Sequence, residues 1–431
     1  MNQKKEIYTL NQFADLISVS KETLRRWDKS GKLPAKRNGI NGYRYYTDEH
    51  LFACSQLELY IPEIEKANNF VKPIKEYTSI ELFAGAGGLA LGFEKAGIEH
   101  ILLNEIDKYA CKTLRFNRKN WNVIEEDIKN LDFSAYKDKI DILTGGFPCQ
   151  AFSYAGKKLG FDDARGTLFF EYARAIKETN PKICIGENVR GLLTHDNGRT
   201  LTGMITILEE LGYRVLEPRI LKAIHYNVPQ KRERLVLVAI RKDIETDFYY
   251  PKPSRKIYTL KDALKKGELF DTDVPESHGQ SYPERKKEIL SMVPPGGYWR
   301  DLPLEIQKEY MLKSFYLGGG KTGMARRISW DEASLTLTCA PAQKQTERCH
   351  PDETRPFTVR EYARIQTFPD DWEFEGSISQ QYKQIGNAVP VNLAKEIGYS
   401  VIDFLNRYYE KEAQESIHGL LENYYQAVAG H

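Results

Sequence analysis

A cysteine at the end of an apolar strand is the feature of this sequence with the most chemical meaning. Cys149 follows the turn Gly145-Gly146-Phe147-Pro148, which comes just past the mostly apolar segment 140–143. Glycines and a proline favour a tight turn, and open α/β folds bind their ligands at the carboxyl edge of the sheet. A thiol held at that edge can act as a nucleophile once it is deprotonated. A buried structural cysteine in a turn is the alternative interpretation of this segment alone.

A glycine-rich turn and two carboxylates upstream of this cysteine predict a cofactor site. Residues 80–83 predict a short strand, and Ala84-Gly85-Ala86-Gly87-Gly88 follows before an apolar helix. This order brings backbone amides close to a ligand. Glu105 ends the next apolar run, where an acidic residue can accept both ribose hydroxyls, and Asp127 stands where a carboxylate can meet a base amine. Helix capping is the alternative role for both carboxylates.

The glycine spacing separates two cofactor classes. The turn reads GxGG rather than GxGxxG, and the motif that follows is a cysteine turn rather than a hydride-transfer site. S-adenosylmethionine therefore fits these residues better than a dinucleotide. From residue 79 onward we expect an α/β fold with a Rossmann-like core.

Composition limits the remaining classes of protein. The chain has 431 residues, of which 41% are hydrophobic and 28% charged, and this length predicts two or three domains. No signal peptide and no apolar run long enough for a membrane span is recognisable, so we expect a cytoplasmic protein without a membrane partner. The six cysteines lie far apart with no CxxC pair, which argues against disulfides and a bound metal. The net charge of +2 requires any nucleic-acid surface to be local.

Residues 7–60 predict a separate small unit with two helices and a wing. Ser20 can cap the second helix, and a turn at residues 38–42 precedes an aromatic segment. The segment TLRRWDKSGKLPAKRNGINGYRYYTDEHL closely resembles the winged helix-turn-helix of the MerR family. The resemblance implies DNA binding, with Arg25 and Arg26 on the recognition helix and Arg44 and Tyr45 on the wing near phosphates. A helical cap that serves only packing or dimerisation is the alternative.

The ordered motifs beyond Cys149 resemble the DNA (cytosine-5)-methyltransferases. The resemblance covers about residues 79–405 and rests on FAGAGG, GGFPCQ, Glu187-Asn188-Val189, PQKRER at 229–234, REYARIQTFP at 360–369 and QIGNAVP at 384–390. It implies transfer of a methyl group from S-adenosylmethionine to C5 of cytosine in a short sequence of double-stranded DNA.

The resemblance also assigns catalytic roles. Cys149 is expected to attack C6 of the cytosine, and Glu187 to hydrogen-bond N3 and the exocyclic amine while charge develops on the ring. Arg234 is expected to contact the carbonyl O2. Arg232 is expected to order the site or to touch a phosphate.

The same resemblance implies a cofactor pocket. Phe83 is expected to face the adenine, Glu105 to hold the ribose and the glycine turn to carry the methionine end. Ile106 stands where an aromatic residue is common in the family, which is expected to loosen adenine stacking slightly. The full set of expected cofactor residues is Phe83, Ala84, Gly85, Gly87, Gly88, Glu105, Ile106, Asp127, Ile128, Pro148, Leu168, Asn387 and Val389.

Chemistry on a cytosine in a duplex requires the base to be flipped out of the stack. Residues 151–164 contain two glycines and predict a loop that closes over the flipped base, with Ser153, Lys157 and Lys158 near DNA. A solvated surface loop is the alternative. Residues 251–355 lose the α/β pattern and are expected to form the target-recognition domain, with Arg326 or Arg327 near DNA. A solvated basic loop is equally compatible with that segment.

The predicted domain organisation follows from these assignments. It comprises the helix-turn-helix at 1–60, a linker at 61–77, the catalytic and cofactor-binding domain at 78–250, the smaller mixed target-recognition domain at 251–355, a return to the catalytic domain at 356–410 and a helical tail at 411–431. The tail has helical apolar spacing, including Ile417, and is expected to pack against the core or a partner.

Two other functions remain open from the sequence. One is a transcription regulator whose methylase core no longer turns over, against which the intact Cys149, Glu187 and Arg234 argue. The other is methylation of tRNA by the same chemistry. The expected partners are the specific double-stranded DNA site, promoter DNA of the chain's own operon, and a cognate restriction endonuclease that acts on the same site without a stable complex.

Overall fold

The computed structural model describes residues 7–17, 19–39, 42–55, 70–148, 167–318 and 321–429. The chain divides into two compact units, each built from separate stretches of sequence. The first unit comprises Met1–Ala67, Lys222–Arg232 and Lys252–Asn392, and the second comprises Asn68–Leu221, Glu233–Pro251 and Leu393–His431.

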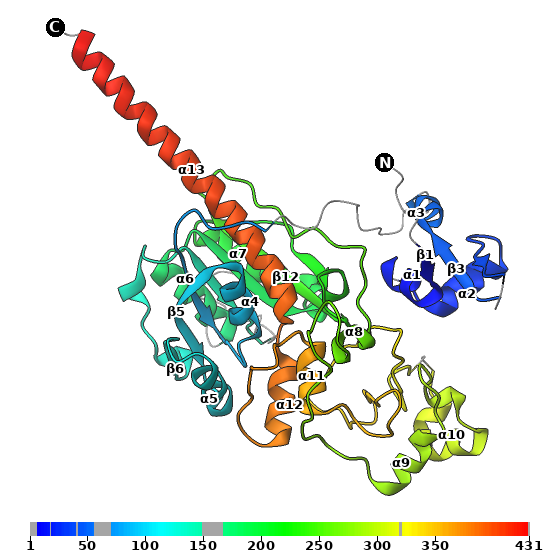
Figure 1. Ribbon diagram of the computed structural model, residues 1–431. Helices are drawn as coiled ribbons and strands as arrows, with labels where there is room; N and C mark the ends of the chain where they lie inside the picture. The colour runs from blue at the N-terminus through cyan, green and yellow to red at the C-terminus, as the bar shows by residue number, and fades with distance from the viewer. Residues whose placement is uncertain are drawn as a thin grey trace. The chain divides into compact units, whose positions relative to one another are not determined.

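The second unit is organised around a mixed sheet (Figure 1). The strand order is β10-β12-β8-β7-β4-β5-β6, and β9 pairs with β12. The strands from β4 to β8 are parallel to their neighbours, whereas β12 is antiparallel to β8. The bounds are β4 (Tyr77–Leu82), β5 (Ile98–Glu105), β6 (Val123–Glu125), β7 (Ile142–Gly145), β8 (Ile183–Val189), β9 (Tyr213–Val215), β10 (Arg219–Lys222) and β12 (Glu233–Arg241).

Helices cover both faces of this sheet, as its nearly continuous apolar strands require. The helices α6 (Leu168–Thr179) and α7 (Arg199–Glu210) share one hydrophobic core with β4 and β7. On the other face, α4 (Gly88–Ala96) contacts α13 (Val391–Ala429), because Gly398 lies directly against Ala96. α5 (Lys108–Asn117) connects β5 and β6.

The strand order predicts where a ligand binds. β4 lies between β5 and β7, and Leu82 at its end is paired with Asn104 on one side and with Gly145 on the other. The chain therefore leaves the sheet in opposite directions at this point, which is the switch point at which α/β proteins bind their ligands.

The N-terminal part of the first unit has the expected helices and a small antiparallel sheet. Its elements are β1 (Ile7–Thr9), α1 (Leu10–Leu16), α2 (Lys21–Lys29), β2 (Lys36–Arg37), β3 (Arg44–Thr47) and α3 (Asp48–Ser55), with sheet order β1-β3-β2. The prediction that Ser20 caps the second helix is confirmed, since its side chain accepts a hydrogen bond from the amide of Thr23 at 3.0 Å. Phe13 stacks on Tyr46 in a separate small core.

The rest of the first unit has short elements joined by long irregular segments. These elements are α8 (Leu260–Leu264), α9 (Glu284–Ser291), α10 (Leu304–Met311), α11 (Val359–Ile365), α12 (Ile378–Asn387) and the two-stranded parallel pair β11 (Gln230–Lys231) and β13 (Ser334–Leu335). The loss of the α/β pattern after residue 251 agrees with the expectation from the sequence. A local hydrophobic core joins α9 and α10 to the buried Met324 and Cys349.

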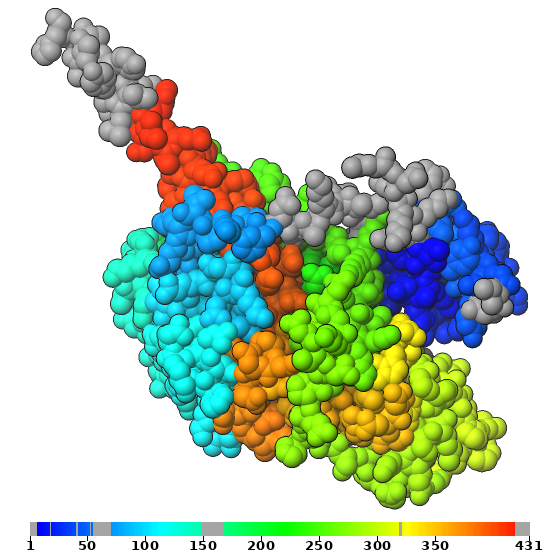
Figure 2. All heavy atoms as spheres, in the orientation of Figure 1, coloured from blue at the N-terminus to red at the C-terminus, as the bar shows by residue number. Residues whose placement is uncertain are grey.

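One continuous helix occupies the C-terminal end of the second unit (Figures 1 and 2). α13 has 39 residues and passes through both the predicted return segment and the predicted tail without interruption. Ile417 is 59% exposed, so it does not pack against the core. Among the described residues, no helix combines the length and the apolar character needed to cross a membrane.

Candidate active site

The glycine turn after β4 has the backbone shape expected of a ligand cradle. Phe83, Gly85 and Gly87 have φ angles of 59°, 54° and 82°, which are left-handed values. A Cβ added at Gly85 would meet nothing within 4 Å, so the backbone there borders open space. The amide of Ala84 donates to the carbonyl of Asn104 at 3.0 Å, which ties the turn to the end of β5. These features fit a small ligand bound against the turn.

Glu105 holds this turn from the neighbouring strand. Its Oε2 accepts the amide of Gly85 at 2.7 Å, and its Oε1 accepts the amides of Ile106 and Asp107, each at 2.8 Å. A carboxylate has about four acceptor positions, so three bonds leave room for a ligand hydroxyl. Ile106 is 66% exposed and stands beside this carboxylate.

The other expected cofactor residues of the second unit have different environments. Asp127 caps a short 3₁₀ helix (Ile128–Asn130) by accepting the amide of Lys129 at 3.0 Å, as the alternative interpretation expected. Ile128 is buried, and Phe83 and Leu168 pack partly against the main core. Asn387 and Val389 belong to the first unit, where Asn387 Oδ1 accepts a hydrogen bond from the Cys339 thiol at 3.0 Å.

The chain reaches Pro148 at the same edge of the sheet, directly after β7. Cys149 lies outside the described residues, as do Ser153, Lys157 and Lys158. The buried Asn188 donates from Nδ2 to the carbonyl of Phe147 at 2.7 Å, which fixes the backbone before the cysteine. A Cβ at Gly146 would lie 3.1 Å from Oε2 of Glu187, so this close approach favours glycine.

Glu187 and Arg234 form a buried ion pair beside this turn. They lie on the antiparallel neighbours β8 and β12, and Arg234 Nε pairs with Glu187 Oε1. Their side chains are only 12% and 9% exposed. Burial raises the pKa of Glu187, and the charge and hydrogen bond of Arg234 partly oppose this shift. The site therefore combines a buried carboxyl group whose pKa is raised with a fixed cation beside it.

Arg232 binds two backbone carbonyls within the first unit. Its Nη1 donates to the carbonyl of Leu337 at 3.1 Å and its Nη2 to that of Gly386 at 2.8 Å, and the residue is buried. These two bonds fix the guanidinium within the first unit, and the expected role of Arg232 at the site stays a prediction. Gly386 also requires glycine, since a Cβ there would lie 2.5 Å from the carbonyl oxygen of Thr338.

The structure corrects the expectation that Arg326 or Arg327 contacts DNA. Both are buried, and Arg326 Nη2 donates to both carboxylate oxygens of Glu332, each at 2.6 Å. Arg327 donates to the carbonyls of Leu290 at 2.8 Å and His350 at 3.0 Å. A buried guanidinium needs such partners because an unpaired charge is costly in the protein interior.

In the helix-turn-helix, one carboxylate that the sequence reasoning missed joins the wing to the second helix. Asp28 on α2 accepts Arg44 Nε at 2.6 Å, Arg37 Nη2 at 2.8 Å and the amide of Ala35 at 3.0 Å. Burial acts to raise the pKa of Asp28, but these donors outweigh burial and the net shift is downward. The sequence contains a signal for this cluster, because Asp28 is an acidic residue on a basic helix and basic residues follow it in the wing. Arg25 and Arg26 on the same helix are exposed.

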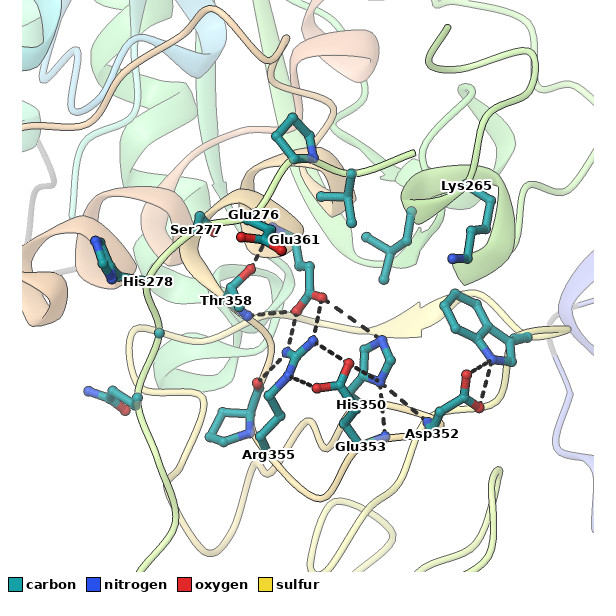
Figure 3. Close-up of a pocket in the computed structure, with 17 residues that line it drawn as sticks. Lys265, Glu276, Ser277, His278, His350, Asp352, Glu353, Arg355, Thr358 and Glu361 are labelled. Atoms are coloured by element: carbon teal, nitrogen blue, oxygen red, sulfur yellow. Dashed lines mark hydrogen bonds and ion pairs between the residues drawn. The ribbon is translucent and has the colours of Figure 1, made fainter. Parts of the chain in front are cut away.

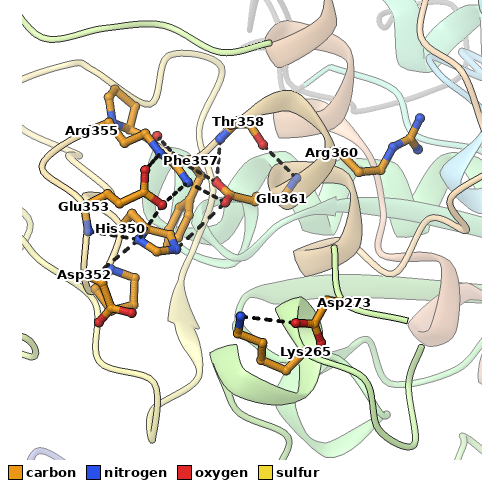
Figure 4. A network of polar contacts seen from close by, with 12 residues as sticks. Lys265, Asp273, His350, Asp352, Glu353, Arg355, Phe357, Thr358, Arg360 and Glu361 are labelled. Carbon is orange, nitrogen blue, oxygen red and sulfur yellow. Dashed lines mark hydrogen bonds and ion pairs between the residues drawn. The ribbon is translucent and has the colours of Figure 1, made fainter. Parts of the chain in front are cut away.

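A cavity of about 620 Å³ in the first unit contains a self-paired polar network (Figures 3 and 4). Arg355 bridges Glu353 and Glu361, with bonds of 2.8 and 2.9 Å to Glu361. His350 Nδ1 accepts the amides of Asp352 at 3.3 Å and Glu353 at 3.2 Å, and burial lowers its pKa. Among the described residues, the lining of this cavity contains no predicted catalytic or cofactor residue. We assign this network a structural role at the start of α11.

Comparison with known proteins identifies the family of both parts of the chain. Residues 77–403 match the family model of C-5 cytosine-specific DNA methylases, and residues 8–52 match that of the MerR HTH family of regulatory proteins. The crystal structure of a Spodoptera frugiperda DNMT2 mutant is similar, with a TM-score of 0.55 and 17% identity, and the match covers 76% of this chain and 99% of that chain. At this identity the likeness supports the fold alone.

Full-length relatives support the same assignment. The Type II methyltransferase M.Eco47II of Escherichia coli is 65% identical over 413 residues, which cover 94% of this chain and 98% of that protein. M.PspPI of Psychrobacter sp. (strain TA137) is 62% identical over 91% of this chain and 95% of that protein. The family implies S-adenosylmethionine as methyl donor. The glycine turn, the motif that leads to Cys149 and the Glu187–Arg234 pair all lie at one edge of the sheet, as the matched family requires. This chain therefore belongs to the C-5 cytosine-specific DNA methylase family and is a DNA (cytosine-5)-methyltransferase.

Proposed function

We propose that the chain methylates C5 of one cytosine within a short specific sequence of double-stranded DNA through a covalent adduct between Cys149 and C6. The observation that carries this proposal is the buried Glu187–Arg234 pair, which lies beside Gly146 three residues before Cys149. S-adenosylmethionine supplies an electrophilic methyl group when bound.

The proposed reaction passes through one covalent bond between the enzyme and the base. The Cys149 thiolate forms a bond to C6, which makes C5 a nucleophile, and C5 then takes the methyl group as the bond from that group to the donor sulfur breaks and leaves S-adenosylhomocysteine. Loss of the C5 proton and β-elimination break the bond between sulfur and C6 and release the cysteine. Glu187 holds N3 and the exocyclic amine, and Arg234 holds O2, so both act where charge changes on the ring. The raised pKa of Glu187 supports a role in which this group shares or donates a proton.

The proposed cofactor contacts follow the edge of the sheet. The glycine turn takes the methionine end, Glu105 the ribose, and Phe83 the adenine. The open space at Gly85 and the remaining acceptor capacity of Glu105 support this arrangement.

Base flipping is part of the proposal, because a stacked cytosine offers neither face to a thiolate. We assign closure over the flipped base to residues 151–164, with Ser153, Lys157 and Lys158 near DNA, on the sequence pattern alone.

The decisive experiment incubates the full chain with labelled S-adenosylmethionine and plasmid DNA and maps modified cytosines by bisulfite sequencing. Methylation at one short motif in the wild type and none in Cys149→Ala is the expected result. Activity retained by Cys149→Ala would refute the nucleophile assignment. If tRNA offered as a substrate takes up the labelled methyl group and DNA does not, the tRNA alternative is favoured. Specific DNA binding without any methylation would favour a regulator.

A second function is proposed for the N-terminal module, which we expect to bind promoter DNA of the chain's own operon. The match of residues 8–52 to MerR regulators and the exposure of Arg25 and Arg26 support this proposal. The full chain should retard the upstream promoter fragment, and the double variant Arg25→Ala/Arg26→Ala should not, while methylation of plasmid DNA persists in both. Equal retardation by both proteins would contradict it. We also propose that a cognate nuclease acts on the same site and that the enzyme works in the cytoplasm. The type II designation of the relatives supports the proposed nuclease.

A further inference from the structure

A buried glutamine that the proposed reaction does not use binds the segment that carries Asn387. Gln366 follows α11 directly and is fully buried. Its Nε2 donates to the carbonyl of Ile385 at 2.7 Å and to that of Ala388 at 3.1 Å. Its backbone carbonyl accepts the amide of Val391 at 3.0 Å. Gln366 therefore fixes the chain on both sides of Asn387.

A second buried glutamine sets the orientation of this amide group. Gln230 on β11 donates from Nε2 to Oε1 of Gln366 at 2.8 Å, and its own Oε1 accepts the amide of Leu337 at 3.0 Å. Because carbonyl oxygens only accept hydrogen bonds, Nε2 of Gln366 must face Ile385 and Ala388, and its Oε1 must face Gln230. Both N–H groups of Gln366 are thus engaged, and the side chain has one orientation.

The same segment has a further buried anchor. Arg232 donates from Nη2 to the carbonyl of Gly386 at 2.8 Å, so the backbone is held immediately before Asn387 as well as beyond it. Asn387 itself is exposed. Its Oδ1 accepts the thiol of Cys339, which is a weak donor. The backbone at this position is therefore fixed, while the side chain remains able to reach a ligand.

The backbone next to Gln366 is strained. Thr367 has a φ angle of 62°, a left-handed value that is rare for a β-branched residue. Its hydroxyl donates to the carbonyl of Gln366 at 2.7 Å and accepts the amide of Asn392 at 2.9 Å. Strain of this kind persists only where the surrounding contacts over-determine it, and it is concentrated at functional sites. This observation supports a functional constraint on the position of Gln366.

We propose that Gln366 is a positioning residue for the cofactor: it fixes residues 385–391 so that the side chain of Asn387 meets bound S-adenosylmethionine. The inference rests on the proposed function and on the cofactor role expected for Asn387. Gln366 is enclosed by protein, so it acts through Asn387 rather than by touching the cofactor.

The test measures binding of S-adenosylhomocysteine to the full-length chain by titration calorimetry. Gln366→Met keeps the approximate length of the side chain and removes both donors to the segment. Its Kd should rise about tenfold, the effect of roughly one lost hydrogen bond. In steady state, this variant should raise KM for S-adenosylmethionine and leave kcat nearly unchanged, because the proposed chemistry on the cytosine does not involve Gln366.

A double variant shows whether the effect passes through Asn387. Asn387→Ala should also raise Kd about tenfold, since the proposed contact with the cofactor is lost. If Gln366 acts only by placing Asn387, adding Gln366→Met to Asn387→Ala should weaken binding no further. A merely structural role would instead weaken binding by the same factor in both backgrounds.

A matched control lies elsewhere in the same unit. Gln307 on α10 also donates from Nε2 to two backbone carbonyls, those of Arg300 at 3.1 Å and Leu302 at 2.7 Å. Gln307→Met removes both bonds and should bind as the wild type does. Should Gln366→Met fail to fold, Gln366→Asn keeps the amide but is one methylene too short to reach both carbonyls, so it should raise Kd in the same way.

The outcomes separate this inference from the proposed cofactor. If the wild type does not bind S-adenosylhomocysteine, the cofactor proposal falls and the inference falls with it. If the wild type binds and Gln366→Met binds equally well, the positioning role alone is refuted. Wild-type affinity in Asn387→Ala, or equal weakening by Gln366→Met with and without Asn387, would also refute it and would leave the proposed contacts of Glu105 and the glycine turn intact.

Discussion

The buried pair of Glu187 and Arg234 makes a quantitative prediction about stability. Both side chains are almost fully enclosed, so removing one partner leaves the other charge buried without compensation. Breaking a buried pair in this way costs about 3–5 kcal/mol. We therefore expect Arg234→Met and Glu187→Gln each to lower the free energy of unfolding strongly. The double variant should be much less destabilised than the sum of the two single variants, because neither charge then remains unpaired.

The assay is urea denaturation of the four chains followed by tryptophan fluorescence, which gives the coupling energy of a double-mutant cycle. A matched control exists in the same region, because Arg190, just after β8, pairs with Glu233 on β12 at 2.9 Å. The Arg190 side chain is 66% exposed, so a cycle of Arg190→Met with Glu233→Gln should give at most about 1 kcal/mol. The buried cycle should exceed about 2 kcal/mol. A coupling energy no larger than that of the exposed control would refute the reasoning from burial.

Three further predictions follow from single residues. Burial raises the pKa of Glu81 from its ordinary value of 4.5 to about 8 in the folded chain, so the folded state binds the proton more tightly. The group's contribution to stability is therefore lost as pH rises between these two values. Glu81→Gln removes this effect, so the Tm of the variant minus the Tm of the wild type should increase as pH rises from about 4.5 to 8. A difference in Tm that does not change with pH would contradict this reasoning. Asp28→Asn should speed amide hydrogen exchange in β2 and β3 at least about tenfold, since charge-assisted bonds to Arg37 and Arg44 are lost; unchanged exchange by mass spectrometry would exclude the clamp. Gly146→Ala should displace the Glu187 carboxylate by a few tenths of an ångström and lower kcat about tenfold with little change in Tm; wild-type kcat would show that the carboxylate position is not critical.

The sequence by itself determined the family, the α/β class and the helix-turn-helix. These conclusions depend on local features: a glycine turn after an apolar run, a cysteine after another, and Ser20 before a helix. Such features keep their meaning because they involve only neighbouring residues and the backbone conformations that those residues allow. The sequence predicts a return segment and a separate tail within residues 391–429, although they contain no proline, whereas the structure has one continuous helix there.

Only the tertiary structure decided which charged side chains are free and which are committed. Arg326 and Arg327 suggested a DNA surface by their type, yet the fold places Glu332 and backbone carbonyls around them. The same is true of Asp28, which binds arginines from the wing, and of Glu81, which accepts a hydrogen bond from Thr144 on β7. A guanidinium or carboxyl group takes whichever donors and acceptors the fold brings within reach, and burial makes those partners obligatory. Contacts between residues far apart in the chain set both conditions, and no local pattern of residue types specifies them.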